Sequence, residues 1–156
     1  MKRLMMLVLV ALLGLPLLTI SNAMAGCVCG PVGTGTPGYW MNHPEAWPVE
    51  EITVGNETWT IEEAISLMKR PVKGDKTLTM FSAFVAAKLN VLIGNCPPAC
   101  YTLAEVNTWL TNFPVDSGVS GNSEAWRYSH GEALYWCLDG YNNGLQNGSP
   151  SRDTLE

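Results

Sequence analysis

The residues best suited to chemistry lie in one twelve-residue stretch, 37-PGYWMNHPEAWP-48. The stretch contains three aromatic side chains, three prolines and one of the two histidines of the chain. Indole and phenol rings can stack on the C–H faces of a sugar, while neighbouring amide and carboxylate groups bond its hydroxyls. We therefore take six residues as the candidate ligand-binding site, namely Tyr39, Trp40, Asn42, His43, Glu45 and Trp47.

The same stretch also fits a purely structural corner. Pro44 suits the first position of a helical turn, which Asn42 or His43 would cap. Because proline favours extended backbone in the residue before it, we expect the chain to run extended through 39–40 and then make one turn. In this interpretation the two tryptophans pack on the longest predicted helix and take no part in binding.

Catalytic and metal-binding interpretations have less support. His43 with Glu45, or Cys137 with His130, would pair a base with a partner, but no G-x-S-x-G or H-E-x-x-H motif accompanies either pair. His130 beside Gly131 also fits the entry to a helix. The cysteine spacings are C-x-C and C-x3-C, which lack the C-x2-C and H-x3-H pairs of zinc sites. We therefore predict no catalytic residues, no metal and no cofactor.

Residues 1–25 have the features of a secretory signal peptide. Lys2 and Arg3 precede an apolar run over 4–20, and Ala23-Met24-Ala25 matches an A-x-A cleavage site. We expect cleavage there, export from the cell, and a mature chain long enough for one domain with its own core.

The five cysteines all follow this segment. Because an exported protein meets an oxidising environment, disulfides are the expected state, with one bridge from Cys29 to Cys137 and a short one from Cys96 to Cys100. Cys27 is then the odd cysteine. The sequence before it resembles a bacterial lipobox, so Cys27 is a candidate for lipidation, or for pairing with another chain.

The charge balance limits the partners. Loss of Lys2 and Arg3 with residues 1–25 lowers the formal net charge from −5 to −7, and no run of Lys and Arg remains. Such a chain is poorly suited to nucleic acid or to anionic membranes. We expect a cell-surface polysaccharide or another surface protein as partner, and membrane contact only through a lipid on Cys27.

The remaining pattern predicts a mainly α domain with one hairpin, linked by disulfides. A glycine-rich lead-in over 26–36 precedes a single domain over 37–146 and a frayed tail over 147–156. Thr60 with Glu63, and Thr102 with Glu105, form helix-capping boxes. Apolar periodicity and turn residues then give a hairpin over 52–60 and four helices, at 61–69, 76–93, 103–112 and 124–142.

Four stretches in the same order resemble a module of secreted and surface proteins of bacteria. GYWMNHPEAWP is similar to its GYWKNHPxxWP signature, with Met41 in place of the usual lysine. RPVKGD at 70–75 resembles its PVRGD turn, AAKLN at 86–90 resembles its AAKLN helix, and LDGYNNG at 138–144 resembles its closing LDxYNNG. The resemblance implies a compact, mostly helical extracellular module with no assigned activity, often appended to larger proteins, of which we expect this chain to be a stand-alone version.

The sequence thus predicts a secreted or cell-surface module that acts through structure or interaction, without catalysis. The first alternative is a small carbohydrate-binding protein that uses Tyr39, Trp40 and Trp47. The second is a hydrolase of unknown class.

Overall fold

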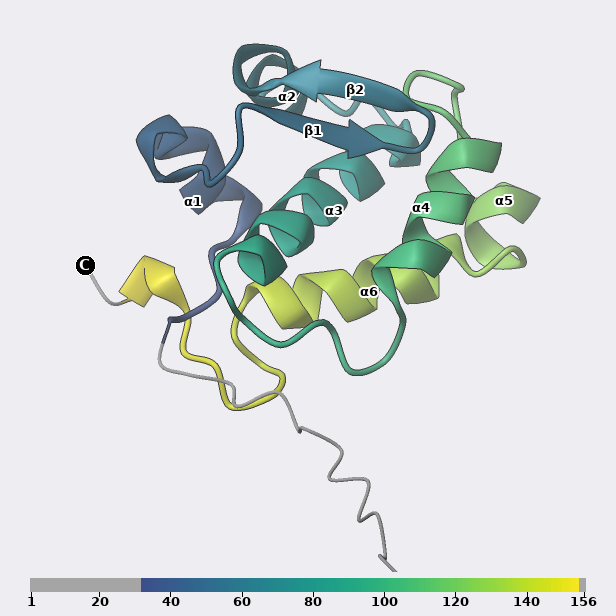
Figure 1. Ribbon diagram of the computed structural model, residues 1–156. Coiled ribbons are helices and arrows are strands. Elements are labelled where there is room, and N and C mark those ends of the chain that lie inside the picture. The colour runs from purple at the N-terminus through teal and green to yellow at the C-terminus, as the bar shows by residue number, and fades with distance from the viewer. Residues whose placement is uncertain (1–31, 155–156) are drawn as a thin grey trace, which may run out of the picture.

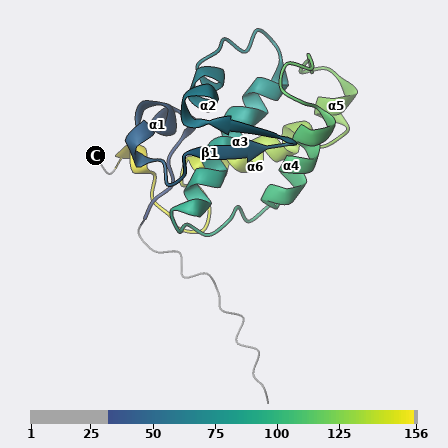
Figure 2. The ribbon, with the colours of Figure 1, turned by 45° about the horizontal axis from the view of Figure 1, so that its top comes forward.

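The computed structural model describes residues 32–154, and its elements surround one long helix, α3. In Figure 1 the hairpin covers one side of α3 and α6 crosses the other side, while α1 and α5 lie at opposite ends in both Figure 1 and Figure 2. Helix α3 contacts α1, α2, β1, α4 and α6. The elements are α1 (Pro37–Asn42), the 3-10 turn η1 (Pro44–Ala46), β1 (Glu51–Val54), β2 (Glu57–Thr60), α2 (Ile61–Met68), α3 (Lys76–Leu92), α4 (Leu103–Asn112), α5 (Glu124–Arg127), α6 (Gly131–Asn142) and the 3-10 turn η2 (Arg152–Thr154).

The apolar composition of α3 explains its central position. Its largest side chains are removed from water on nearly every side, and Met80, Phe81, Val85 and Leu89 have no exposed surface. Burial of each such side chain contributes about 1.5–3 kcal/mol. A helix that is apolar all round is stable only when other elements cover it, which is the role of the hairpin and the four helices that contact it.

The predicted fold class is confirmed. The described residues form a mainly α domain with one antiparallel hairpin, in which Ile52 pairs with Trp59 and Val54 with Glu57. Both capping boxes are present, at Thr60 and at Thr102, and start α2 and α4 where the sequence places them. The helices predicted at 61–69, 76–93 and 103–112 are therefore present within one residue of their predicted bounds, while the one predicted at 124–142 is divided into α5 and α6.

The interruption separates α5 from α6, where the sequence predicts one helix over 124–142. His130 has φ of 60°, in the left-handed region, which interrupts the right-handed helical conformation between α5 and α6. A Cβ on Gly131 would lie 2.9 Å from the Trp109 ring and 3.0 Å from the carbonyl oxygen of Ala125. Because Gly131 has no side chain, the backbone packs directly on the Trp109 indole. Helical periodicity in the sequence gives no indication of such a tertiary contact.

The C-terminal segment is docked over 147–154, so the predicted frayed tail is wrong for these residues. Thr34 and Ser151 form a parallel bridge, and the amide of Thr34 donates to the carbonyl of Pro150 at 2.8 Å. The Thr36 hydroxyl also donates to the Asp153 carboxylate at 2.5 Å. The predicted signal peptide over 1–25, the start of the lead-in and the candidate lipidation site Cys27 lie outside the described residues.

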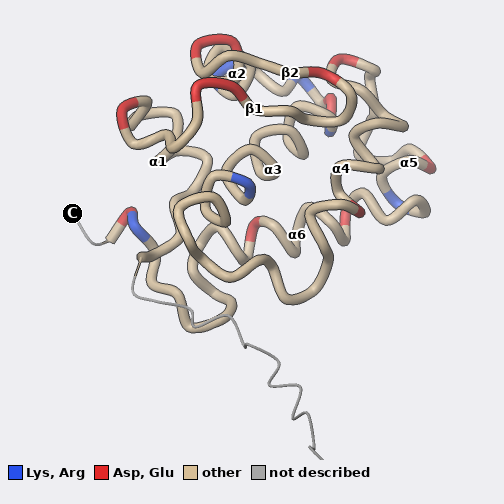
Figure 3. Tube along the Cα trace, in the orientation of Figure 1, with Lys and Arg blue, Asp and Glu red and all other residues tan. Residues whose placement is uncertain are grey.

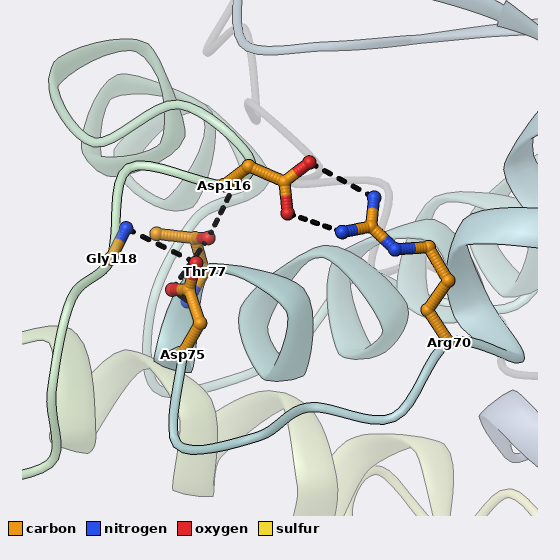
Figure 4. Close-up of polar contacts among 5 residues, drawn as sticks. All are labelled: Arg70, Asp75, Thr77, Asp116 and Gly118. Carbon is orange, nitrogen blue, oxygen red and sulfur yellow. Dashed lines mark hydrogen bonds and ion pairs between the residues drawn. The ribbon is translucent and has the colours of Figure 1, made fainter.

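A set of polar contacts fastens the turn after α2 to the loop over 113–122 (Figure 4). The Asp75 carboxylate caps α3 by accepting from the Thr77 amide at 2.9 Å, and it also accepts from the Gly118 amide at 3.1 Å. Arg70 donates through both terminal nitrogens to Asp116, at 2.9 and 2.5 Å. This guanidinium holds the pKa of the Asp116 carboxyl below its usual range, so the pair stays ionised near neutral pH.

A disulfide joins Cys100 to Cys137, with Cα atoms 6.0 Å apart. Cys96 is disulfide-bonded as well, so both expected pairings, Cys29 with Cys137 and Cys96 with Cys100, are wrong. Cys100 follows the Pro-Pro turn and lies against α6, where Gln146 accepts from the Ala99 amide at 3.0 Å and donates to the Cys137 carbonyl at 2.7 Å. Disulfides form in oxidising surroundings, which agrees with an extracellular location.

Within residues 32–154, none of the helices has the length and apolar character needed to cross a membrane.

We predict that replacing Cys100 and Cys137 together by serine lowers the free energy of unfolding by about 4 kcal/mol, because the bridge closes a loop with a sequence separation of 37. Denaturant unfolding followed by tryptophan fluorescence measures the change, with Ser120→Ala on the exposed loop as control. Non-reducing peptide mapping should recover the two cysteines in one linked pair. A mapped bond between Cys137 and Cys29 would contradict the account.

Candidate functional site

The opening stretch begins with a helix, where the sequence predicts extended chain over 39–40. The Thr36 hydroxyl caps α1 by accepting from the Tyr39 amide at 3.1 Å, and Pro37 occupies the first turn. A proline in that position needs no hydrogen-bond partner for its nitrogen, so Thr36-Pro37 starts the helix rather than preventing it. The following turn is present as η1, without a side-chain cap from His43.

The three aromatic rings of this stretch lie in the core. Trp40 is fully buried, and Tyr39 and Trp47 are each 8% exposed. The Trp40 indole donates to the side-chain oxygen of Asn90 at 3.1 Å, and the Trp47 indole donates to the backbone carbonyl of Trp40 at 2.9 Å. Their faces are packed against protein, so this geometry is that of a rigid corner and offers no platform for a sugar.

Asn90 on α3 is the centre of a buried polar network. Its side-chain oxygen accepts from the Gly35 amide at 2.7 Å as well as from Trp40, and its nitrogen donates to the Gly35 carbonyl at 2.9 Å. The same nitrogen donates to Asn142 on α6 at 3.0 Å, and Asn142 donates to the Ala83 carbonyl at 2.9 Å. Both asparagines are fully buried. One side chain thereby joins the start of the domain, α3 and α6.

The polar candidates of the stretch lie at the surface. His43 stacks on Tyr39, with ring centroids 4.4 Å apart, and its Nδ1 lies 3.1 Å from the Glu45 carboxylate. The backbone amide of Glu45 and then His43 hold the pKa of that carboxyl below its ordinary value. Asn42 is exposed beside them. The structure brings His43 and Glu45 together as a surface pair, and such exposed pairs contribute little to stability.

The second catalytic pairing that the sequence offers, Cys137 with His130, lacks a free thiol. Cys137 forms the disulfide with Cys100 and carries no thiol that could act as a nucleophile beside His130. Within residues 32–154, no group of three or more His, Cys, Asp or Glu residues is placed to hold a metal ion.

A cleft of about 450 Å³ lies between α4 and the chain that enters α6. Its floor is apolar, with Trp109 and Leu134 each 4% exposed. Tyr101 and Phe113 stand half-buried at its sides. The exposed rim is polar and consists of Glu105, Thr108, Asn112, Ser129 and His130. Cavities of this size and composition commonly hold small ligands.

Glu105 supplies the one carboxylate among the described residues that line this cleft. Its Oε2 accepts from the Thr102 amide at 2.7 Å and from the Thr102 hydroxyl at 2.8 Å, as the capping box requires. These bonds, first the amide and then the hydroxyl, lower the pKa of Glu105 and keep it negatively charged.

Sequence reasoning missed the cleft because its two walls are far apart in the chain. One signal was present: residues 101, 105, 108 and 112 recur at helical spacing and mix aromatic with polar types. The other wall depends on the break at His130, which the predicted continuous helix hides.

Comparisons of the chain with models of protein families, with curated proteins and with solved structures found no match.

We predict that Gly35→Ala destabilises the protein by about 1–3 kcal/mol, because a methyl group overpacks this corner. A Cβ at Gly35 would lie 2.6 Å from the Tyr39 ring and 2.9 Å from the Trp40 indole nitrogen. Gly38→Ala is the matched control, since its Cβ would meet nothing closer than the Thr36 hydroxyl at 3.5 Å. That substitution lies within α1 and should be neutral or stabilising by up to about 1 kcal/mol. Equal unfolding midpoints for both variants would show that the corner is not tightly packed.

Proposed function

We propose that the protein is an exported helical module that acts by contact with another molecule at or outside the cell surface, without catalysis. The main support is the position in the structure of the four stretches that resemble the bacterial module. Trp40 from the first, Asn90 from the third and Asn142 from the fourth meet in one buried network. The second stretch supplies Arg70 and Asp75 to the contacts over α3 (Figure 4). The residues that carry the resemblance serve the fold, which favours a module defined by its architecture.

The surface supports the same class of partner. Four of the seven Lys and Arg residues of the described chain lie within 69–76, where Arg70 is paired with Asp116, and the other three lie apart from them (Figure 3). Asp and Glu outnumber Lys and Arg over residues 32–154, so the basic residues do not dominate the surface. Nucleic-acid binding rests on a concentrated basic patch. A surface protein or a polysaccharide therefore fits the charge of this surface better than a polyanion such as nucleic acid.

Export also has support from the cysteines. All three cysteines of the described chain are in disulfides, and disulfides of this kind persist outside the reducing cytoplasm. A signal peptide over residues 1–25, with its charged start and A-x-A end, would bring the chain there.

Expression of the full chain in a bacterial host, followed by fractionation and thiol alkylation, tests the location. We expect the protein outside the cytoplasm with Cys100 and Cys137 protected from alkylation, and we expect a variant lacking residues 1–25 to stay inside. A full-length protein retained in the cytoplasm with reactive cysteines contradicts the proposal. Turnover of glycoside, ester or peptide substrates by the purified protein would contradict its non-catalytic part.

A further inference from the structure

We propose that the cleft between α4 and the start of α6 binds a neutral saccharide, with the sugar held as a ligand. This deepens the proposed function by naming a site and a ligand class, and it rests on that function in treating the sugar as bound and not cleaved. The site is distinct from the aromatic stretch 37–48, whose rings are buried.

The distribution of polar and apolar surface in the cleft matches a sugar. Trp109 and Leu134 close the bottom with apolar surface, and the half-buried rings of Tyr101 and Phe113 flank it. A sugar ring presents C–H groups on its faces and hydroxyls around its edge. Its face would lie toward this apolar floor, while its hydroxyls meet the polar rim of the cleft.

The charge of the lining selects a neutral ligand. Among the described residues that line the cleft, none is Lys or Arg, while Glu105 is ionised. A phosphate, sulfate or uronic acid would therefore meet the Glu105 carboxylate without a Lys or Arg side chain to compensate it. Thr102 occupies Oε2 of Glu105, and Oε1 accepts no hydrogen bond from residues 32–154. Oε1 is thus the strongest acceptor for a sugar hydroxyl.

Both walls of the cleft are fixed before any ligand arrives. The Trp109 indole donates to the Ala125 carbonyl at 3.2 Å, and its ring centroid lies 6.0 Å from that of Trp126. These contacts restrict rotation of the Trp109 side chain at the bottom of the cleft. Tyr101 directly follows Cys100, which the disulfide attaches to α6. On the opposite side His130 is held in the left-handed region, a conformation that costs energy for a residue other than glycine. A pre-formed cleft loses little entropy when it binds a small ligand.

Two variants probe the site without endangering the fold. Glu105→Gln removes the charge but keeps a side chain that serves in a capping box. His130→Gly removes the imidazole and relieves the left-handed backbone, so its melting temperature should not fall. Trp136→Ala is the control, because Trp136 is an aromatic residue with 60% exposure that does not line the cleft.

Calorimetric titration of the full oxidised chain with short neutral oligosaccharides of glucose, xylose, mannose or N-acetylglucosamine tests the inference. We expect at least one to bind, with affinity reduced about tenfold or more in Glu105→Gln and His130→Gly and unchanged in Trp136→Ala. Absence of binding to all four classes overturns the inference, as does preferential binding of an anionic sugar or a cationic amine. Loss of binding in Trp136→Ala alone also overturns it, since the site would then lie elsewhere.

Mass spectrometry of the sugar after incubation separates this inference from the proposed function. An intact bound sugar supports both. A sugar that binds through Glu105 and is cleaved leaves the cleft as the binding site and overturns the non-catalytic function. A protein that is exported and inert but binds no sugar retains the proposed function and loses this inference.

Discussion

The fold depends on the side-chain amide of one buried asparagine, Asn90. Its oxygen and nitrogen make four hydrogen bonds, to the amide and carbonyl of Gly35, to the Trp40 indole and to Asn142. A polar group inside an apolar core is stable only when its donors and acceptors are satisfied, and here they are satisfied by segments far apart in the chain. Through Asn90, helix α3 therefore also determines which segments pack around it, although its other side chains are mostly apolar. Asn95 extends the network by donating to the carbonyls of Gly33 and Asn90, at 2.8 and 2.9 Å.

This arrangement places the aromatic-rich corner and the proposed binding cleft on different contacts. The stretch richest in aromatic and titratable residues supplies the corner that closes over Asn90, while the cleft is built from α4 and the entry to α6 on other contacts. Lys88, two residues before Asn90, donates to the Thr53 carbonyl at 2.6 Å and attaches the hairpin to the same helix. Polar residues of one turn of α3 thus hold the segment before α1, helix α6 and the hairpin, and none of these contacts involves α4.

Much of the fold follows from local signals in the sequence. The capping boxes at Thr60 and Thr102, the apolar pattern of α3 and the Gly55-Asn56 turn each act within a few residues, so their elements appear where predicted. One error is local, since the Thr36-Pro37 cap starts α1 where extended chain is predicted. The other errors concern contacts between distant segments. Cys137 pairs with Cys100 because the loop before α4 lies on α6, and Gly131 breaks a helix because Trp109 lies against it. The aromatic density of 37–48 could not distinguish a platform from a core, because composition does not say which way a ring faces.

The most direct test replaces Asn90 with leucine, which has similar volume and no hydrogen-bonding groups. Gly35, Trp40 and Asn142 would then have buried polar groups without partners, and each such group costs about 1–3 kcal/mol. The account predicts that Asn90→Leu lowers the free energy of unfolding by more than about 3 kcal/mol, while Asn112→Leu at the exposed end of α4 changes it by less than about 0.5 kcal/mol. An Asn90→Leu protein that unfolds at the same denaturant concentration as the parent would contradict the account.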